Sequence, residues 1–239
     1  MILPLSRIQI MLSVAQSRPS ERAIFIQKTY LHLAGAIGAF IVVEFLLFQL
    51  GIAEAMFQFV AGGRFSWLLI LGAFSLLGWM SRGLVAKADQ VGTQYAGLGV
   101  YVVAQALIFA PMLYMAAAFS DANVIPTAGI LTLTMFGGLT AIAFTTRTDF
   151  TFLGGILKIG SFVALGLIVC SYIFGFSLGL FFSVVMVVFA SAAILYDTSK
   201  VMKHYSTRHY VAASLELFAS VALLFWYILR IVMSMSSRQ

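Results

Sequence analysis

The stretch Ala193-Ile194-Leu195-Tyr196-Asp197-Thr198-Ser199-Lys200 ends one long apolar segment, and a second follows at about 210–233 after a basic loop. The second segment carries Glu216 and Ser220, where a membrane span normally carries only apolar side chains. A charge at that depth costs on the order of 2.5–3.5 kcal/mol on insertion scales, so it is usually paired, hydrated or functional. The carboxylates of Asp197 and Glu216 are therefore the first candidates for a functional site.

Composition places the whole chain in a membrane. Of 239 residues, 62% are hydrophobic and 9% are charged, and the mean hydropathy is +1.04. Soluble domains carry about 25% charged residues, so these values indicate an integral membrane protein. The net charge of +6 does not indicate nucleic-acid binding, because the basic residues fall between apolar segments rather than in one patch. Cys170 is the only cysteine, which excludes an internal disulfide.

Apolar segments of membrane-spanning length set the expected fold. A membrane helix needs roughly 20 apolar residues, and β-barrel alternation is absent. We expect an all-α integral membrane protein with seven transmembrane helices and one transmembrane domain at 28–233, between a cytoplasmic tail at 1–27 and a short tail at 234–239. The predicted spans are 29–50, 66–86, 95–118, 125–145, 153–174, 178–198 and 210–233.

Two further patterns concern the N-terminus and helix packing. The apolar run at 8–14 is too short for a convincing signal peptide, and a cytoplasmic tail, lying on the surface as a helix, fits it better. Ser20-Glu21-Arg22-Ala23 opens a helix that continues into the first span. The glycine-rich segments 34–38 and 154–160 predict close helix packing rather than phosphate loops, since no strand precedes either of them.

The basic residues predict the orientation. With the N-terminus in the cytoplasm, 11 of the 14 Lys and Arg residues lie at the cytoplasmic face and three lie outside. Such a bias is the usual topology signal. Seven spans then place the C-terminus outside.

Three stretches together resemble one known family. Residues 25–30 read Phe-Ile-Gln-Lys-Thr-Tyr, residues 137–153 read Gly-Gly-Leu-Thr-Ala-Ile-Ala-Phe-Thr-Thr-Arg-Thr-Asp-Phe-Thr-Phe-Leu, and residues 194–198 read Ile-Leu-Tyr-Asp-Thr. These resemble the Bax inhibitor-1 family, in particular its bacterial YccA-like branch, from about residue 22 to 232. The stretch 137–153 is the most specific of the three.

The resemblance implies a fold and a function. It implies a bundle in which six helices surround a central C-terminal helix, a passive pH-sensitive calcium leak, and, in bacteria, modulation of a membrane-bound AAA protease. In calcium-leak members two aspartates form a proton-sensitive pair that a basic residue can lock. The first aspartate matches Asp197, and Arg82 approximates the basic residue, with Ser81 as the neighbouring register. Ser220 occupies the place of the second aspartate.

Glu216 is the candidate substitute for that aspartate. It lies four residues before Ser220 on the same helical face, so we expect it at a depth similar to that of Asp197. The two carboxyls would share a proton, close a hydrogen bond when protonated, and admit water and a cation when ionised. With Ser220 and Thr198 they would form only a weak calcium transit site, because calcium takes six to eight oxygens. In the alternative interpretation Asp197 pairs with Lys200 or Arg82, and Glu216 reaches the headgroups.

Other polar residues within spans are secondary candidates. Glu44 in the first span and Gln105 in the third would line the ion pathway or hydrogen-bond between helices. His32 is expected to be a hydrogen-bonded packing residue, with a pH sensor as the alternative. Pro111 follows Gln105 and is expected to kink the helix.

No enzyme is expected. Residues 175–179 match the G-x-S-x-G hydrolase pattern, but that motif needs a strand-to-helix elbow. The histidines are predicted at the opposite face from Ser177, and we expect no cofactor and no tight metal site.

Two classes of function remain. One is a proton-gated cation leak with the lipid bilayer, calcium ions and protons as partners. The other is an interaction protein that modulates a membrane-bound AAA protease. Coupled transport of a small solute is a third reading, without a readable substrate. In each case we expect a multi-pass protein of the bacterial inner membrane.

Overall fold

The computed structural model describes residues 13–63, 66, 72, 76, 78–81, 83, 91–146 and 148–236. Within that part of the chain, six helices are long and apolar enough to cross a membrane. The predicted all-α, multi-pass architecture is thus confirmed, whereas most of the predicted span 66–86 lies outside the described residues. The helices are α1 (Pro19–Gln49), α2 (Ile52–Gly62), α4 (Val91–Phe119), α5 (Val124–Thr145), α6 (Leu153–Phe174), α7 (Gly179–Lys203) and α8 (Tyr210–Ser236), with the short 3-10 helices η2 (Val14–Gln16) and η3 (Phe150–Phe152).

Local sequence explains where α1 begins and ends. Pro19 occupies the first turn, where its missing N–H removes no hydrogen bond, and Glu21 lies at the positive end of the helix dipole. The helix that was predicted to open at Ser20-Glu21-Arg22-Ala23 thus begins at Pro19, inside the segment 1–27 that we assigned to the tail. Gly51 has φ +71°, the left-handed conformation that commonly ends a helix, and the short apolar helix α2 follows it. None of the predicted spans corresponds to α2.

The helix α7 is longer than its apolar segment. It continues to Lys203, five residues beyond the predicted end of the span, so Asp197 and Lys200 lie one turn apart on a continuous helix. Lys200 and Lys203 in the last turn are favourable at the negative end of the helix dipole. The loop to α8 is correspondingly short, at 204–209.

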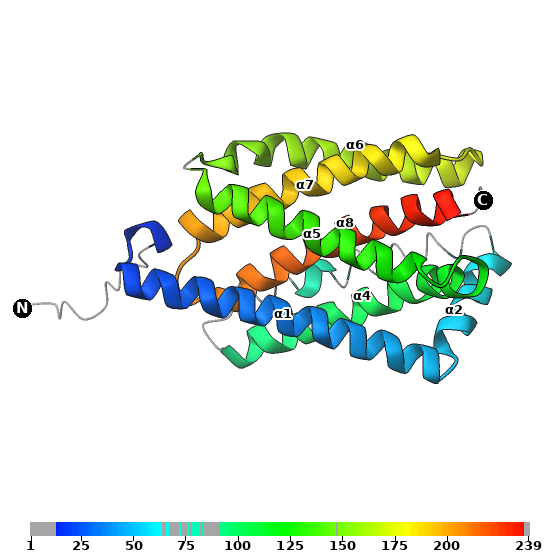
Figure 1. The fold of residues 1–239 in the computed structure, drawn as a ribbon, viewed down its shortest axis with the longest axis horizontal. Helices are drawn as coiled ribbons and strands as arrows, with labels where there is room; N and C mark the ends of the chain where they lie inside the picture. The colour runs from blue at the N-terminus through cyan, green and yellow to red at the C-terminus, as the bar shows by residue number, and fades with distance from the viewer. Residues whose placement is uncertain are drawn as a thin grey trace, which may run out of the picture.

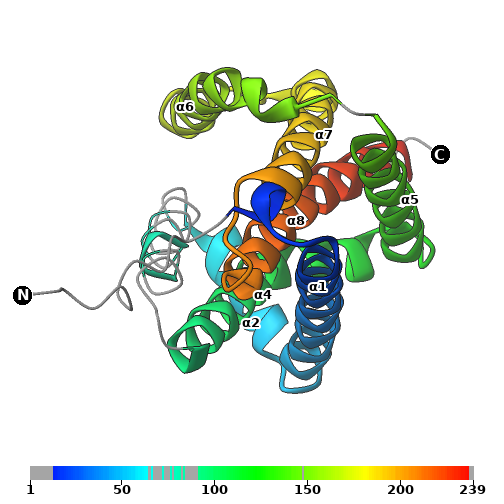
Figure 2. The ribbon, with the colours of Figure 1, turned by 90° about the vertical axis from the view of Figure 1, so that its left-hand side faces the viewer.

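The helix α8 packs against helices on several sides. It contacts α1, α4, α5 and α7, and in the end-on view it lies among them (Figure 2). Phe109 and Phe218 are buried in these interfaces, while Phe162 and Phe181 are exposed on the outside of the bundle. An apolar exterior of this kind suits lipid rather than water.

The helix α6 lies at the edge of the bundle and packs mainly on α7 (Figures 1 and 2). A Cβ added at Gly154 would lie 2.8 Å from the Tyr196 ring, and one at Gly160 would lie 2.7 Å from the Phe189 ring. Close packing at 154–160 is therefore confirmed. The same prediction for 34–38 is wrong at Gly35 and Gly38, because a Cβ there would meet no atom within 4 Å.

The segment before α1 is docked on the loop between α7 and α8. The Val14 N–H donates to the Tyr205 carbonyl at 2.8 Å, and Ser13 and Ser206 form an isolated antiparallel bridge. The Val14 side chain is fully buried, and the rings of Phe25 and Tyr205 stack at 6.5 Å. The last part of the tail is thus packed in the fold, while most of the run at 8–14 lies outside the described residues.

Candidate functional site

The buried carboxyl of Asp197 has a hydroxyl partner on the next helix. The Ser220 Oγ of α8 donates to the Asp197 Oδ2 of α7 at 2.5 Å, and both residues are buried. The position that the family resemblance assigned to a second aspartate therefore does contact Asp197. A serine there supplies a donor in place of a second negative charge.

Glu216 has a different partner. The Lys200 Nζ donates to both of its carboxylate oxygens, at 2.8 and 3.1 Å, and each of the two side chains is 32% exposed. We expected Asp197 and Glu216 to hydrogen-bond with each other; the contacts that the structure gives are Asp197 with Ser220 and Glu216 with Lys200. The physical reason is the extension of α7, which places a cation one turn after Asp197 and opposite Glu216. Lys200 therefore pairs with Glu216.

Tyrosine rings surround this ion pair. The Lys200 Nζ lies 5.8 Å from the Tyr196 ring centroid and 5.4 Å from that of Tyr205. Burial raises the pKa of the Tyr205 phenol, and the nearby negative charges of Glu216 and Asp197 raise it further. Both carboxylates therefore lie near one half-buried phenol. Sequence reasoning missed Tyr205, because its position depends on the path of the α7–α8 loop.

Further hydroxyl groups lie along the same end of α7. Tyr30 of α1, Thr140 of α5 and Thr198 of α7 bring three hydroxyls near one another, and none of them has a hydrogen-bond partner of good geometry within the described residues. Thr198 is fully buried. The site is therefore a polar region inside the bundle, formed by α1, α5, α7 and α8.

The loop before α6 is fixed to the end of α7. The Phe150 N–H donates to the Ser199 Oγ at 3.2 Å, and the Asp149 carboxylate accepts the Thr151 N–H at 3.0 Å. The Asp149 Oδ2 also lies 3.5 Å from the Lys203 Nζ. Hydrogen bonding by Thr151 and the charge of Lys203 lower the pKa of Asp149 to about 2. The motif that carried the family resemblance thus holds α7 in place beside the site.

Three other predicted site residues come before α7 in the chain: Arg82, Glu44 and Gln105. Arg82 is outside the described residues, and the Ser81 hydroxyl is buried without a partner within them. Glu44 is 6% exposed, and neither of its oxygens has a hydrogen-bond partner in the described part of the chain. The Gln105 carbonyl oxygen is also buried and unpaired there. Neither residue shows the expected interhelical bond through these oxygens, although α4 does continue through Pro111.

His32 is a hydrogen-bonded packing residue, as expected. Its Nδ1 donates to the Lys28 carbonyl at 2.7 Å, and its Nε2 lies 2.6 Å from the Tyr95 hydroxyl. Its ring also contacts that of Tyr210. Both ring nitrogens therefore have partners within the bundle.

The hydrolase pattern has no matching geometry. Ser177 is exposed in the turn between α6 and α7, which joins two helices rather than a strand and a helix. Among the described residues, no three His, Cys, Asp or Glu side chains are grouped so as to hold a metal ion.

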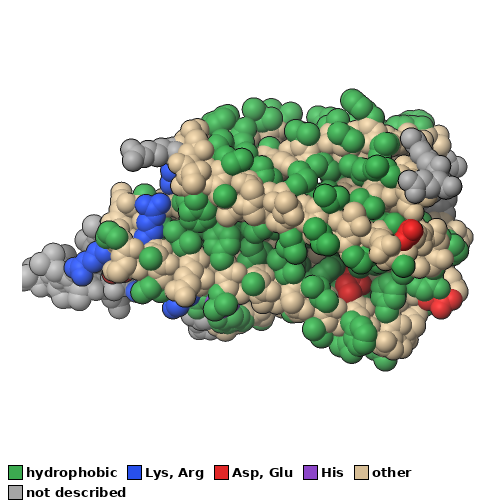
Figure 3. Space-filling view, in the orientation of Figure 1, with side chains coloured by type: hydrophobic (Ala, Val, Ile, Leu, Met, Phe, Trp, Pro, Cys, Tyr) green, Lys and Arg blue, Asp and Glu red, His purple; other side chains and the backbone are tan. Residues whose placement is uncertain are grey.

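Charge is distributed unevenly between the two ends of the bundle. On the face in Figure 3, Lys and Arg side chains gather at the end where α1 begins, and Asp and Glu side chains gather at the opposite end. The surface between them is largely hydrophobic (Figure 3). Glu216 pairs with Lys200, and Lys200 and Lys203 lie in the last turn of α7, just after Asp197.

Known proteins resemble this chain over much of its length. A family model described as "Inhibitor of apoptosis-promoting Bax1" matches residues 22–238. An uncharacterized protein of Pseudomonas aeruginosa is 41% identical over 110 residues, which are 46% of this chain and 49% of that protein. The "Modulator of FtsH protease YccA" of Escherichia coli K12 is 32% identical over 128 residues, 52% of this chain and 57% of that protein. The "Inner membrane protein YccA" of a second E. coli strain matches equally. The chain spans about half the length of each of these relatives.

Proposed function

The chain belongs to the Bax inhibitor-1 family, and from this premise we propose that it is a pH-sensitive passive cation leak of the bacterial inner membrane. The observation that carries the proposal is the buried Asp197 carboxyl, hydrogen-bonded to Ser220 between the apolar helices α7 and α8. A carboxyl in that position is costly, so it is expected to serve ions or protons.

The proposed gate is the polar region around Asp197. When Asp197 is protonated, its bond to Ser220 closes the contact between α7 and α8. When it is ionised, its negative charge attracts water and a cation, while Lys200 neutralises Glu216 beside it. Weak binding suits a leak, because an ion must leave the site as readily as it enters. Calcium is the proposed ion, with Asp197 as its transit contact and Glu216 as a second contact when the ion pair with Lys200 opens.

A flux assay tests this proposal. The full-length protein is reconstituted into liposomes that enclose a calcium indicator, and calcium flux is measured from pH 5.5 to 8. We expect flux to increase with pH, Asp197→Asn to lower it and remove the pH response, and Ser220→Ala to keep the flux but shift the response. The matched control is Asp121→Asn, in the exposed turn before α5. Unchanged flux and pH response in Asp197→Asn and Glu216→Gln would refute the proposal.

A second function is favoured by one relative, which carries the name of a protease modulator. In that case the chain would regulate a membrane-bound AAA protease without conducting ions, and its N-terminal segment would be a docking element. Deletion of residues 1–22 should then abolish the effect on degradation of a membrane substrate, and Asp197→Asn should retain it. The opposite pattern would exclude this function.

We also propose the finer topology. Residues 66–86 would form a seventh span, so that six helices surround α8, with the N-terminus in the cytoplasm and the C-terminus outside. The basic end of the bundle agrees with a cytoplasmic N-terminus (Figure 3). Alkaline phosphatase fused after residue 239 should be active and green fluorescent protein should be dark; six spans would reverse both results.

A further inference from the structure

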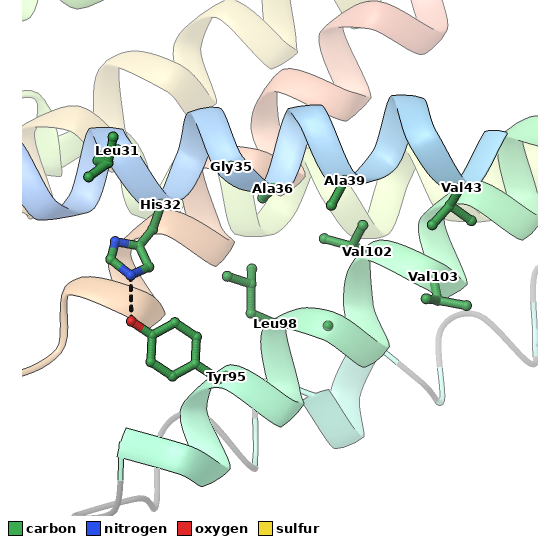
Figure 4. A pocket seen from close by; sticks show the side chains of 11 residues that line it. Leu31, His32, Gly35, Ala36, Ala39, Val43, Tyr95, Leu98, Val102 and Val103 are labelled. Carbon is green, nitrogen blue, oxygen red and sulfur yellow. Dashed lines mark hydrogen bonds between the residues drawn. The ribbon is translucent and has the colours of Figure 1, made fainter. Parts of the chain in front are cut away.

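A groove between α1 and α4 has no function in the proposals above. It has a volume of about 460 Å³ and opens on the side of the bundle. Its walls are almost entirely apolar, with branched side chains such as Leu98 and Val102 (Figure 4). Between them lie the small residues Gly35, Ala36, Ala39 and Gly99. A Cβ at Gly35 or Gly99 would meet no atom within 4 Å, so side chains of the described residues leave this space open.

One end of the groove is polar. His32 and Tyr95 meet there across the gap between the two helices (Figure 4). Lys28 precedes His32 by one turn, and its Nζ lies 5.3 Å from the Tyr210 ring centroid. Lys28 is exposed and forms no ion pair with a described residue. The positive charge of Lys28 and the hydrogen-bonded rings of His32 and Tyr95 therefore lie at one end of the apolar groove.

The length of the groove fits one membrane leaflet. It extends along α1 from His32 to Val43, which is eleven residues or roughly 16 Å at about 1.5 Å per residue. The hydrocarbon core of a bilayer is about 30 Å thick, so the groove covers about half of it. A transmembrane helix of a partner would need a contact surface across both leaflets, whereas an acyl chain needs only one.

We propose that this groove binds one phospholipid with an anionic headgroup, from the leaflet around the N-terminal end of α1. An acyl chain lies between α1 and α4 over Gly35 and Gly99, and the headgroup phosphate lies by Lys28. Charge complementarity selects the anionic lipid, because a juxtamembrane lysine attracts a negative headgroup. This site requires the membrane-spanning fold but not ion conduction.

Native mass spectrometry of the full-length protein tests the proposal. The detergent-solubilised protein is titrated with phosphatidylglycerol and with phosphatidylcholine of identical chains. We expect one phosphatidylglycerol to bind about fivefold more tightly, the factor that one lysine near an anionic surface contributes. Lys28→Gln should remove this preference, and the control Lys158→Gln, at an exposed lysine on α6, should keep it.

The acyl chain is tested separately. Gly35→Leu and Gly99→Leu fill the groove from its two walls, and each should lower binding of both lipids about tenfold or more. The control Gly38→Leu adds the same side chain to α1 at another glycine, where an added Cβ would also meet no atom within 4 Å. Circular dichroism and thermal unfolding verify that each variant is folded. If one wall variant does not fold, the other provides the result.

Three results would overturn the proposal. Unchanged lipid binding in a folded Gly35→Leu or Gly99→Leu variant would place the lipid elsewhere. A headgroup preference that survives Lys28→Gln would remove the role of that lysine. A wild-type dimer that Gly35→Leu dissociates would show that a second copy of the chain, rather than a lipid, occupies the groove.

Discussion

Removing the ion pair between Lys200 and Glu216 should destabilise the protein in an asymmetric way. The perturbations are Lys200→Met, Glu216→Gln and the double variant. Glu216 lies six residues after the start of α8, about 9 Å along the helix at about 1.5 Å per residue. Lys200→Met leaves the Glu216 carboxylate without its cationic partner. Glu216→Gln leaves Lys200 beside the rings of Tyr196 and Tyr205, which partly stabilise its charge.

The magnitude follows from the geometry. At about 3 Å and an effective dielectric constant of about 20, two unit charges attract by roughly 5.5 kcal/mol before desolvation and side-chain entropy oppose them. Exposed pairs retain about 0.2–1 kcal/mol, and breaking a buried pair costs about 3–5 kcal/mol. This pair is 32% exposed on both sides. We therefore expect losses of about 2–3 kcal/mol for Lys200→Met and about 1 kcal/mol for Glu216→Gln, with a coupling energy of about 1.5 kcal/mol.

Equilibrium unfolding in mixed detergent micelles, followed by tryptophan fluorescence, measures these free energies. Lys158→Met is the control, since Lys158 is exposed and forms no ion pair within the described residues. It should change the free energy of unfolding by less than about 0.5 kcal/mol. If the two single losses simply add in the double variant, or if Glu216→Gln is the more costly, the reasoning is wrong.

Three further predictions concern the surroundings of the site. Gly154→Leu should lower the free energy of unfolding by about 1–3 kcal/mol through overpacking. The neighbouring Gly155→Leu should not, because a Cβ there meets no atom within 4 Å. Equal effects of the two substitutions in thermal unfolding would contradict this prediction. The pKa of Asp149 is lowered from 3.8 to about 2, so its ionised form stabilises the fold above pH 3.8 and this contribution disappears as the pH falls toward 2. The difference in melting temperature between wild type and Asp149→Asn should shrink over that range, and a constant difference would be evidence against it. Val14→Asp should release the segment before α1, seen as faster hydrogen exchange at residues 13–17; unchanged protection there would show that the docking does not depend on this side chain.

Six of the seven predicted spans coincide with described helices, because membrane helices depend on long apolar runs that hydropathy reads directly. The end of α7 could not be predicted in this way. Asp197 and the lysines lower the hydropathy after residue 196, yet the helix continues to Lys203, since its backbone hydrogen bonds do not depend on apolar side chains. The short helix α2 was missed for a related reason, as its 11 residues are fewer than a span needs.

The site could be predicted only in part. Helical spacing places Glu216 and Ser220 on one face of α8, and the family resemblance identified Asp197 and the position of Ser220. Neither signal could assign the hydrogen-bond partner of Glu216. The choice between Lys200 and Asp197 depends on the rotation of α7 against α8. Tyr205 is positioned by a loop and by the docked Val14, and no local pattern encodes either contact.

The position of α8 in the chain has a consequence for biosynthesis. The helices α1, α4, α5 and α7 all contact α8, and all of them leave the ribosome before it. Until α8 is inserted, Asp197 lacks Ser220, and Lys200 lacks Glu216. While the final segment is being translated, the newly made protein therefore exposes the polar side chains of Asp197 and Lys200 without their partners on α8. A translocation partner that shields these side chains, or rapid synthesis of the last helix, would protect the nascent chain from quality-control degradation.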